Sequence, residues 1–303
     1  MMNEVITELE QLSVGKMEKN VSLSKYTTYR VGGEAKLIVY PKNANCLIKT
    51  IRVARAYHFP YKILGKGSNL LFSDAPFEGI LIKLDEFDKL EFFGKNKIRV
   101  GAGYSLVKLS LMAAKRGLTG LEFAAGIPGT VGGAVFMNAG AYKSDMGYIV
   151  QEVTVLTPDL RIITLENKEM NFHYRTSFLQ KHPNYICLEV VLKLEKGERA
   201  AIETVIKDRR KRRVESQPLE FPSAGSVFRN PEGMFAGQLI EELGLKGFQI
   251  GGAKVSEKHA NFIVNYDNAS SDDVKALIEY VRKKVQSEYH VELKVEQEFV
   301  NWE

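Results

Sequence analysis

The sequence predicts an α+β fold, in which helices and strands mix without regular alternation. Segments with the two-residue apolar alternation of strands and segments with helical periodicity follow one another irregularly along the chain. Such an order argues against a regular parallel sheet. The length of 303 residues suits two domains, and 45% apolar residues are enough to build their cores.

The N-terminal quarter of the chain predicts a small α/β unit. A short apolar strand spans 35–40 and stops at Pro41. Asn43 or Asn45 then caps a helix that reaches about Tyr57. A second strand ends in an apolar pair, and a glycine turn follows it directly.

The middle of the chain predicts strands, two hairpins and one helix. The expected elements are a strand over 80–84, a hairpin of 90–93 with 97–100, a helix that Ser105 begins and Gly117 ends, a hairpin of 150–156 with 161–165, and a long strand over 185–194.

The C-terminal third predicts three helices and one last strand. The expected elements are a charged helix over 198–214, helices over 236–243 and 271–288, and a strand over 291–299. We place the domain boundary between residues 200 and 201. The first domain, 1–200, is expected to contain two α/β subdomains that divide near residue 85, and 201–303 is expected to form the second domain.

The densest glycine stretch of the chain lies at 121–142. It has five glycines and neither lysine nor arginine. Without Cβ atoms the backbone can turn sharply, and successive N–H groups can then hold an anion such as a phosphate or pyrophosphate. The alternative is a set of tight buried turns, in which small residues only permit close packing.

A second glycine turn, Gly65-Lys66-Gly67-Ser68-Asn69-Leu70, follows the apolar pair Ile63-Leu64. Neither turn has the spacing of a P-loop, and neither has the third glycine of a dinucleotide fingerprint. Together the two turns predict a nucleotide cofactor bound by a fold that is not the Rossmann fold.

Composition excludes several classes of protein. The N-terminal residues have no apolar signal-peptide core, and no apolar run approaches the length of a membrane span, so we expect a cytoplasmic protein without membrane insertion. Cys46 and Cys187 lie far apart and form no C-x-x-C motif, which favours reduced structural thiols. The five histidines show no metal-binding spacing, and a net charge of +5 is too small to demand nucleic acid.

A basic run at 209–213 contains Arg209, Arg210, Arg212 and Arg213. Within a helix such a run is usually a solvated face, and the aromatic residues that accompany nucleic-acid binding are missing nearby. The alternative is that one or two of these arginines reach an anionic substrate.

Five motifs in order along the chain resemble the UDP-N-acetylenolpyruvoylglucosamine reductase (MurB) family. They are GKGSNLLFSD at 65–74, AAGIPGTVGGAVFMNAGAY at 124–142, YRTSF at 174–178, AGSVFRNP at 224–231 and GGAKVSEKHANFIVN at 251–265. Only 51 positions separate Arg175 from Ser226, which leaves no room for the insertion of the longer subfamily, so the chain resembles the shorter form.

The resemblance implies an FAD-binding fold of the p-cresol methylhydroxylase type, followed by a C-terminal α/β substrate-binding domain. It also implies the reaction of the family, in which NADPH reduces non-covalent FAD and UDP-N-acetylglucosamine enolpyruvate becomes UDP-N-acetylmuramate for bacterial peptidoglycan. In that reaction, hydride passes from N5 of reduced FAD to substrate C3, and a proton reaches C2.

The resemblance assigns cofactor-binding roles to both glycine turns and to a short N-terminal loop. The residues implied are Arg30, Val31, Gly32, Gly65, Lys66, Gly67, Ser68, Asn69, Leu70, Ala125, Gly126, Ile127, Pro128, Gly129, Thr130, Gly132, Gly133, Ala134, Asn138, Ala139 and Gly140. None of them is a histidine or cysteine, so we expect FAD without a covalent link. No metal site is expected.

Three residues carry the chemistry by resemblance. Arg175 would hold the enolpyruvyl carboxylate, because a guanidinium forms paired hydrogen bonds with carboxylates, and Ser226 would protonate C2. Glu296 matches the C-terminal L-x-x-E pattern of the family. The alternatives are that Arg175 is a surface arginine and that Ser226 is a turn serine. Glu296 could be a solvated glutamate, since the last strand alternates apolar and polar residues.

Tyr142, Asn230 and His259 match positions that contact substrate in members of the family. Two other functions are compatible with the glycine turns. One is an FAD oxidase of the same fold acting on a small alcohol or sugar, and the other is a flavin- or nucleotide-binding regulator without turnover.

Overall fold

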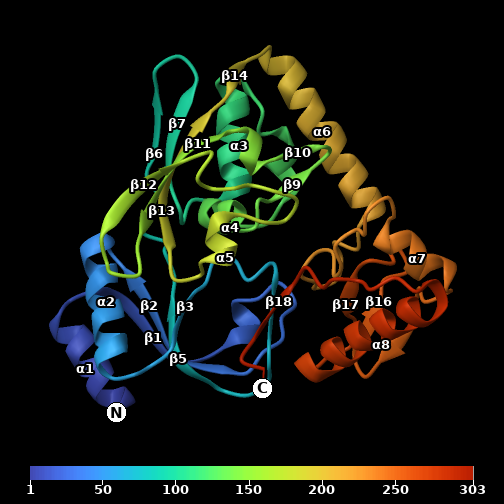
Figure 1. The fold of residues 1–303 in the computed structure, drawn as a ribbon, viewed down its shortest axis with the longest axis horizontal. Helices are drawn as coiled ribbons and strands as arrows, with labels where there is room; N and C mark the ends of the chain where they lie inside the picture. Colours follow the sequence, from blue (N-terminus) through green and yellow to red (C-terminus); the bar gives the residue numbers. More distant parts are fainter. Residues whose placement is uncertain (303) are drawn as a thin grey trace. The chain divides into compact units, whose positions relative to one another are not determined.

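The computed structural model describes residues 1–302, which divide into two compact units (Figure 1). The first unit consists of Met1–Lys19, Leu37–Gly65 and Glu78–Lys211. The second consists of Asn20–Lys36, Lys66–Phe77 and the chain from Arg212 onward. The predicted division into 1–200 and 201–303 concerns functional domains, and it stays a prediction.

The N-terminal part of the first unit packs two helices with a four-stranded sheet. The sheet has the order β1 (Gly15–Ser22), β2 (Glu34–Pro41), β5 (Phe77–Ile82), β3 (Tyr61–Ile63). Helix α2 (Ala44–Ala56) is the predicted helix, and the Asn43 side chain caps it by accepting from the Cys46 N–H at 3.0 Å. Helix α1 (Met2–Gln11), which the sequence did not predict, lies beside α2 (Figure 1).

A second, antiparallel sheet follows in the same unit. Its order is β12 (Ile162–Glu166), β11 (Val150–Leu156), β13 (Ile186–Lys193), β7 (Lys97–Gly101), β6 (Leu90–Phe93), so both predicted hairpins and the predicted long strand are confirmed. Helix α3 (Leu106–Lys115) begins after Ser105, whose side chain caps it as predicted. Helix α4 (Val131–Phe136) packs against β13.

The remaining elements of the first unit are short, apart from one long helix. They are β8 (Leu118–Thr119), 3₁₀ helix η2 (Glu122–Gly126), β9 (Gly140–Ala141), β10 (Ser144–Asp145), η3 (Met146–Tyr148), α5 (Phe178–Lys181), β14 (Glu195–Lys196) and α6 (Arg199–Ser216), of which this unit includes the residues up to Lys211. Of the residues in the predicted charged helix α6, only Ile202 and Ile206 are buried, so most of the helix is exposed to solvent.

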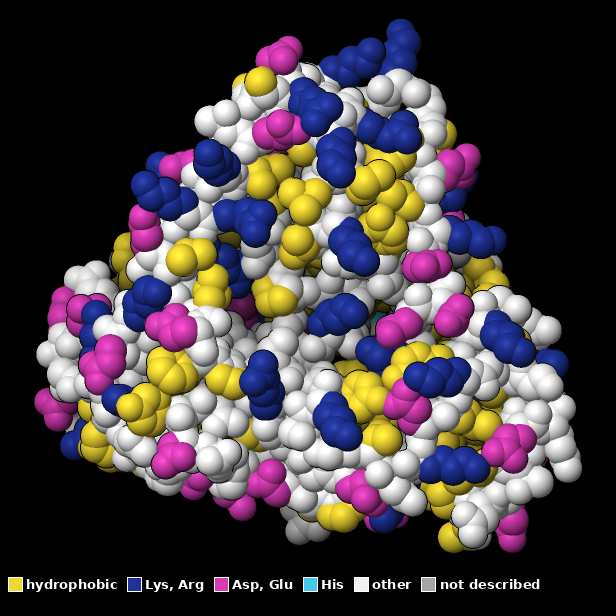
Figure 2. Space-filling view, turned by 180° about the vertical axis from the view of Figure 1, so that it is seen from behind, with side chains coloured by type: hydrophobic (Ala, Val, Ile, Leu, Met, Phe, Trp, Pro, Cys, Tyr) yellow, Lys and Arg dark blue, Asp and Glu magenta, His cyan; other side chains and the backbone are white. Residues whose placement is uncertain are grey.

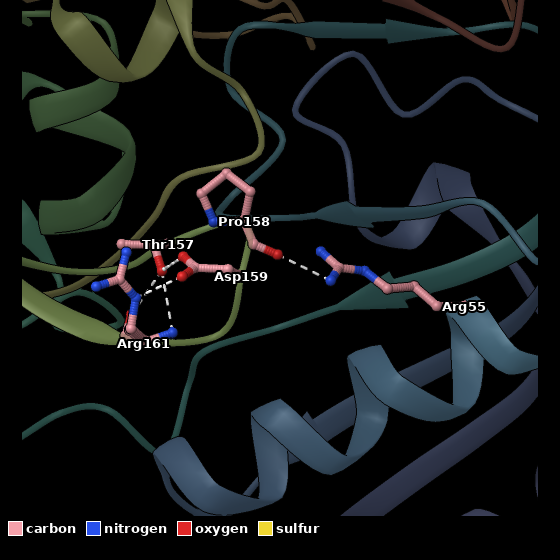
Figure 3. Close-up of polar contacts among 5 residues, drawn as sticks. All are labelled: Arg55, Thr157, Pro158, Asp159 and Arg161. Carbon is pink, nitrogen blue, oxygen red and sulfur yellow. Dashed lines mark hydrogen bonds and ion pairs between the residues drawn. The ribbon is translucent and has the colours of Figure 1, made fainter.

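The turn of the β11–β12 hairpin is held by side chains (Figure 3). The Thr157 hydroxyl lies 2.5 Å from Asp159 Oδ1 and accepts from the Arg161 N–H at 3.0 Å, while Arg161 also pairs with Asp159. The hydrogen bond from Thr157, together with Arg161, holds the pKa of Asp159 below its usual value. From α2, Arg55 donates to the Pro158 carbonyl at 2.8 Å, which ties the hairpin to that helix.

The core of the first unit is one continuous apolar cluster. It extends from Val5 on α1 to Leu194 after β13, and it includes both Cys46 and Cys187. Both cysteines are free and buried, as predicted, and burial raises the pKa of the Cys187 thiol to about 12. This thiol is therefore inert at neutral pH.

The second unit joins distant segments of the chain around α8 (Ser271–Tyr289). Strand β4 (Leu70–Phe72) pairs in parallel with β18 (Glu298–Val300), and β15 (Gln249–Ile250), β16 (Ala253–Val255) and β17 (Ile263–Asn265) form an antiparallel sheet. The remaining elements are η1 (Leu23–Lys25) and α7 (Ala236–Glu242). Ser270 and Asp273 form a capping box that starts α8, the last of the three helices predicted for the C-terminal third.

The predicted last strand over 291–299 is wrong in its extent. Strand β18 covers only Glu298–Val300, and a single bridge joins Val295 to Phe228. The partner of this segment is an irregular loop, because the Arg229 N–H donates to Lys294 and the Glu296 N–H donates to Val227. An isolated pairing of this kind keeps the backbone extended without forming a regular strand.

On the face drawn in Figure 2, Lys and Arg side chains stand among Asp, Glu and hydrophobic side chains and do not form one continuous basic area. Within residues 1–302, no helix has both the length and the apolar character needed to cross a membrane. In the same residues, no three His, Cys, Asp or Glu side chains are placed to hold a metal ion.

Candidate functional site

Two glycine turns far apart in the sequence meet at Thr130 in the first unit. Thr130 is buried and caps α4, its hydroxyl accepting from the Gly133 N–H at 3.2 Å. A Cβ atom built on Gly65 would lie 3.0 Å from the same hydroxyl oxygen, and one built on Gly133 would lie 3.3 Å from it. The absence of side chains at both glycines therefore keeps open the space beside Thr130.

The neighbouring glycine, Gly132, has a different environment. A Cβ atom built on it would lie 2.9 Å from the Cβ of Ala102, so Gly132 permits packing inside the protein. Gly133 is exposed instead. Within 121–142, the alternative that small residues only permit close packing thus applies to Gly132. Gly133 faces outward, as a ligand-binding residue would.

A buried lysine supports the first glycine turn. The Lys83 side chain is only 6% exposed, and its Nζ donates to the Gly65 carbonyl at 3.0 Å and lies 3.3 Å from Asp85 Oδ1. Because a buried charge is costly unless it is paired, these contacts fix Lys83 beside the turn. Sequence reasoning missed this residue, although a lysine directly after the apolar strand β5 was a signal.

Asn138 and Arg175 connect the glycine stretch to the YRTSF motif. Asn138 is buried, donates to the His173 carbonyl at 2.8 Å and accepts from the Gly147 N–H at 2.9 Å. Arg175 Nη2 donates to the Gly140 carbonyl at 2.9 Å. Arg175 itself lies at φ 51°, in a tight turn that paired hydrogen bonds between His173 and Thr176 close.

Tyr142 lies beside one arginine of the basic run. Its hydroxyl donates to the Arg209 carbonyl at 3.2 Å, and the Arg209 guanidinium lies 4.9 Å from the centre of the Tyr142 ring. Arg209 is half-buried, whereas Arg210 is exposed. Arg209 therefore differs from the neighbouring Arg210, because it contacts Tyr142, a predicted substrate residue.

Two predicted cofactor segments and the C-terminal segment with Glu296 come together in the second unit. Gly67 has φ 62°, and a Cβ atom there would overlap the Tyr26 carbonyl oxygen, so no other residue fits this turn without a shift. The Thr28 N–H donates to the Gly67 carbonyl at 3.2 Å, which links the turn to the Arg30–Gly32 loop. Asn69 Nδ2 donates to the Glu296 carbonyl at 3.1 Å, so the same turn also holds the C-terminal segment.

Ser226 and Glu296 lie on paired segments of the second unit. The Glu296 N–H donates to the carbonyl of Val227, the residue that follows Ser226, at 2.8 Å. Both residues are partly buried, whereas Glu292 is exposed. The structure thus brings together two of the three predicted catalytic residues, and the polar positions of this segment are not uniformly solvated.

Asn230 and His259 each hold a neighbouring main chain. Asn230 Oδ1 accepts from the Ala236 N–H, the first residue of α7, at 3.1 Å. His259 Nδ1 accepts from the Asn261 N–H at 3.2 Å, and burial lowers the pKa of His259 below its ordinary value of 6.5. The imidazole is therefore neutral near pH 7, with its second nitrogen carrying the proton.

The predicted residues divide between the two units. Gly65, the 125–140 residues, Tyr142 and Arg175 belong to the first unit. Arg30 to Gly32, Lys66 to Leu70, Ser226, Asn230, His259 and Glu296 belong to the second.

Comparison with known proteins gives the family. The model of the UDP-N-acetylenolpyruvoylglucosamine reductase C-terminal domain matches residues 217–300, and the model of an FAD binding domain matches 35–166. The UDP-N-acetylenolpyruvoylglucosamine reductase of Anoxybacillus flavithermus is 48% identical over 300 residues, which cover 99% of each chain. The chain belongs to the UDP-N-acetylenolpyruvoylglucosamine reductase family.

Other members of this reductase family show the same relation. The reductase 1 of Bacillus cereus is 44% identical over 99% of each chain. The crystal structure of the Thermus caldophilus reductase superposes with a TM-score of 0.80 at 38% identity, covering 94% of this chain and 98% of that one. The predicted fold class and the predicted family are therefore confirmed, and FAD is the cofactor of the fold.

Proposed function

We propose that this chain reduces UDP-N-acetylglucosamine enolpyruvate to UDP-N-acetylmuramate, with NADPH as the reductant. The observation that carries the proposal is the end-to-end identity of 48% with a reductase of that name. The oxidase and regulator alternatives have no comparable support. We also propose that 1–200 binds FAD, that 201–303 binds substrate, and that the protein works in the cytoplasm.

The residues present fit an FAD pyrophosphate. Beside Thr130, Gly65 and Gly133 leave a space that a Cβ atom on either would narrow, and Gly133 is exposed at the start of α4. Main-chain N–H groups in such turns hold phosphate oxygens without side-chain charge. When bound, FAD supplies the redox chemistry by carrying two electrons from NADPH to the substrate.

Arg175 is proposed to bind the enolpyruvyl carboxylate. Its Nη2 donates to the Gly140 carbonyl at 2.9 Å, which holds the side chain in one orientation beside the glycine stretch. A preoriented cation of this kind stabilises negative charge that develops on the carboxylate during reduction.

Ser226 is proposed to donate the proton to substrate C2. Among residues 1–302, no hydrogen-bond partner of its hydroxyl is found, although the segments on both sides of it are hydrogen-bonded. Glu296 is proposed to act in the same site, since its backbone pairs with Val227 next to Ser226. A carboxylate there can orient a donor or accept a proton.

Tyr142, Asn230 and His259 are proposed to contact the substrate. The guanidinium of Arg209 beside Tyr142 adds positive charge suited to a diphosphate. The neutral imidazole of His259 keeps an N–H for donation, because its Nδ1 already accepts a hydrogen bond.

The test is a pair of anaerobic half-reactions with the purified protein. NADPH should bleach bound flavin, and the enolpyruvyl substrate should restore its colour with formation of UDP-N-acetylmuramate. Rapid reoxidation by oxygen with a polyol, and none with the enolpyruvyl compound, would favour the oxidase. Bound FAD without NADPH consumption would favour the regulator.

A further inference from the structure

One buried amide, Gln297, contacts the loop that carries Ser226. Its side chain is only 4% exposed, and it lies in the second unit with Tyr29 and the 224–226 loop. Oε1 accepts from the Tyr29 hydroxyl at 3.0 Å. Nε2 donates to the Ala224 carbonyl at 3.2 Å and lies 3.4 Å from the Gly225 carbonyl oxygen. The amide therefore reaches both residues that precede Ser226.

An apolar residue would be expected where Gln297 lies. Leu293 and Val295 have the same parity along the extended segment, and Leu293 is fully buried. Placing an amide in a core costs free energy unless all its groups are hydrogen-bonded. Here Tyr29 is 0% exposed, so its hydroxyl depends on Gln297 as its partner. The hydrogen bond between Tyr29 and Gln297 satisfies both buried polar groups, and it directs the amide N–H groups of Gln297 to the 224–226 loop.

The loop itself needs such support on one side. Gly225 has φ 75°, and a Cβ atom there would meet nothing within 4 Å, so glycine is required by the backbone conformation and not by crowding. On the other side of Ser226, the Phe228 N–H donates to Asn261 Oδ1 at 2.9 Å, and Asn261 Nδ2 donates to the Phe228 carbonyl at 2.8 Å. Ser226 thus stands between two segments that buried amides hold.

We propose that Gln297, oriented by Tyr29, is a positioning residue that fixes the loop so that the Ser226 hydroxyl can deliver its proton. The inference rests on the proposed function, since it takes Ser226 as the proton donor. Gln297 touches neither cofactor nor substrate in this proposal and acts through the backbone of 224–226. A small displacement of a reacting group lowers the rate steeply, which gives the amide its effect.

The test compares Gln297→Met, which keeps the length of the side chain and loses its hydrogen bonds to Tyr29 and to the 224–225 backbone, with the milder Tyr29→Phe. Both variants should bind FAD and be reduced by NADPH within about twofold of the wild-type rate. Reoxidation by the enolpyruvyl substrate should be about 10-fold to 100-fold slower in Gln297→Met and less affected in Tyr29→Phe. Val281→Ala, which removes buried volume from α8, is the stability control and should reoxidise normally.

A double variant separates positioning from a general structural role. In a Ser226→Ala background, Gln297→Met should cause no further slowing, because the group it positions is gone. Additive slowing, or wild-type reoxidation in Gln297→Met alone, would overturn the inference while leaving the reductase function intact. If Ser226→Ala itself reoxidises at the wild-type rate, the proton-donor assignment and the inference both fail. An absence of any NADPH-dependent turnover would instead refute the proposed function.

Discussion

Gly132 and Gly133 are adjacent in the sequence but serve different purposes. Gly132 lies against Ala102, whereas the position of a Cβ atom on Gly133 is open apart from the Thr130 hydroxyl at 3.3 Å. From the sequence alone the two positions could not be distinguished, because composition shows where a turn can form and not which way each residue faces. The difference makes a cofactor test possible in which one substitution meets only the Thr130 hydroxyl and the other meets the packed Ala102.

Gly133→Val should weaken FAD binding at least about tenfold, equivalent to about 1.4 kcal/mol, by placing a branched side chain in the proposed pyrophosphate space. Its free energy of unfolding without FAD should change by less than about 0.5 kcal/mol. Gly132→Val should lower both the FAD affinity and the free energy of unfolding, since overpacking costs about 1 to 3 kcal/mol. Flavin titration and urea unfolding measure the two effects. A Gly133→Val protein with unchanged FAD affinity would remove this residue from the cofactor site.

Glu296 can be compared with Glu292 in the same segment. Glu296 is partly buried beside the Ser226 loop, while Glu292 is exposed. Glu296→Gln should slow the substrate-driven reoxidation of flavin at least about tenfold, equivalent to about 1.4 kcal/mol of transition-state stabilisation. Reduction by NADPH should hardly change. If Glu292→Gln and Glu296→Gln behave alike in single-turnover measurements, the C-terminal segment carries no catalytic residue.

The burial of His259 predicts a pH-dependent stability. Burial lowers the pKa of this imidazole below 6.5, so the unfolded chain binds the proton more readily. The contribution of the neutral imidazole to the free energy of unfolding is fully present above the pKa of the unfolded state. It is lost as pH falls below that value toward the pKa of the folded state. Urea unfolding between about pH 8 and pH 5 should show this decline in the wild type and a flatter profile in His259→Gln. Parallel profiles would show that another group is responsible.

For helices and strands, prediction succeeded where the local sequence determines the structure, and it failed where the pairing partner of the backbone determines it. The predicted Asn43 and Ser105 caps start α2 and α3, and α8 covers the predicted 271–288, where a Ser270 capping box starts the helix. The segment 291–297 has the alternation of a strand, but it meets an irregular loop and stays outside any sheet. Alternation reports which side chains face inward, and it cannot report what the backbone pairs with.

Helix α6 provides a matched pair of arginines for a substrate test. Arg209 lies against the Tyr142 ring, and Arg210 is exposed. Arg209→Ala should raise the KM for the enolpyruvyl substrate about fivefold to tenfold with little change in kcat, because it removes cation–π support and charge that act in binding. Arg210→Ala should leave both constants within about twofold. Steady-state kinetics of the two variants settle the comparison, and equal effects would contradict the role of Arg209.

The core of the second unit includes residues from outside the segment that the C-terminal family model matches. The C-terminal family model spans 217–300, but the core of the second unit also contains Tyr29, Val31 and Leu71. The sequence indicated a two-domain α+β protein and most predicted site residues by resemblance. It missed Lys83, which pairs with both Asp85 and the Gly65 carbonyl, and Gln297, whose buried amide is explained only by Tyr29, a partner distant in the sequence.

A fragment spanning 212–303 should therefore not fold on its own. Losing buried Tyr29 and Leu71 removes several kcal/mol, roughly 3 to 5 kcal/mol for a large side chain, from a total that is about 5 to 15 kcal/mol in whole domains. Far-UV circular dichroism and urea titration should show no cooperative transition in the fragment, in contrast to the full chain. A cooperative transition would show that the N-terminal segments are dispensable.

The discontinuity of the second unit also sets the order of events during synthesis on the ribosome. Residues 20–36 and 66–77 emerge early, yet their partners in 212–303 are made last. At bacterial rates of elongation the gap is on the order of ten seconds, long compared with the collapse of a chain. Throughout that interval Tyr29, Val31 and Leu71 lack the apolar neighbours that will cover them. Chaperones that bind short apolar segments would meet this protein there, and a pause in translation upstream of residue 212 would prolong the exposure.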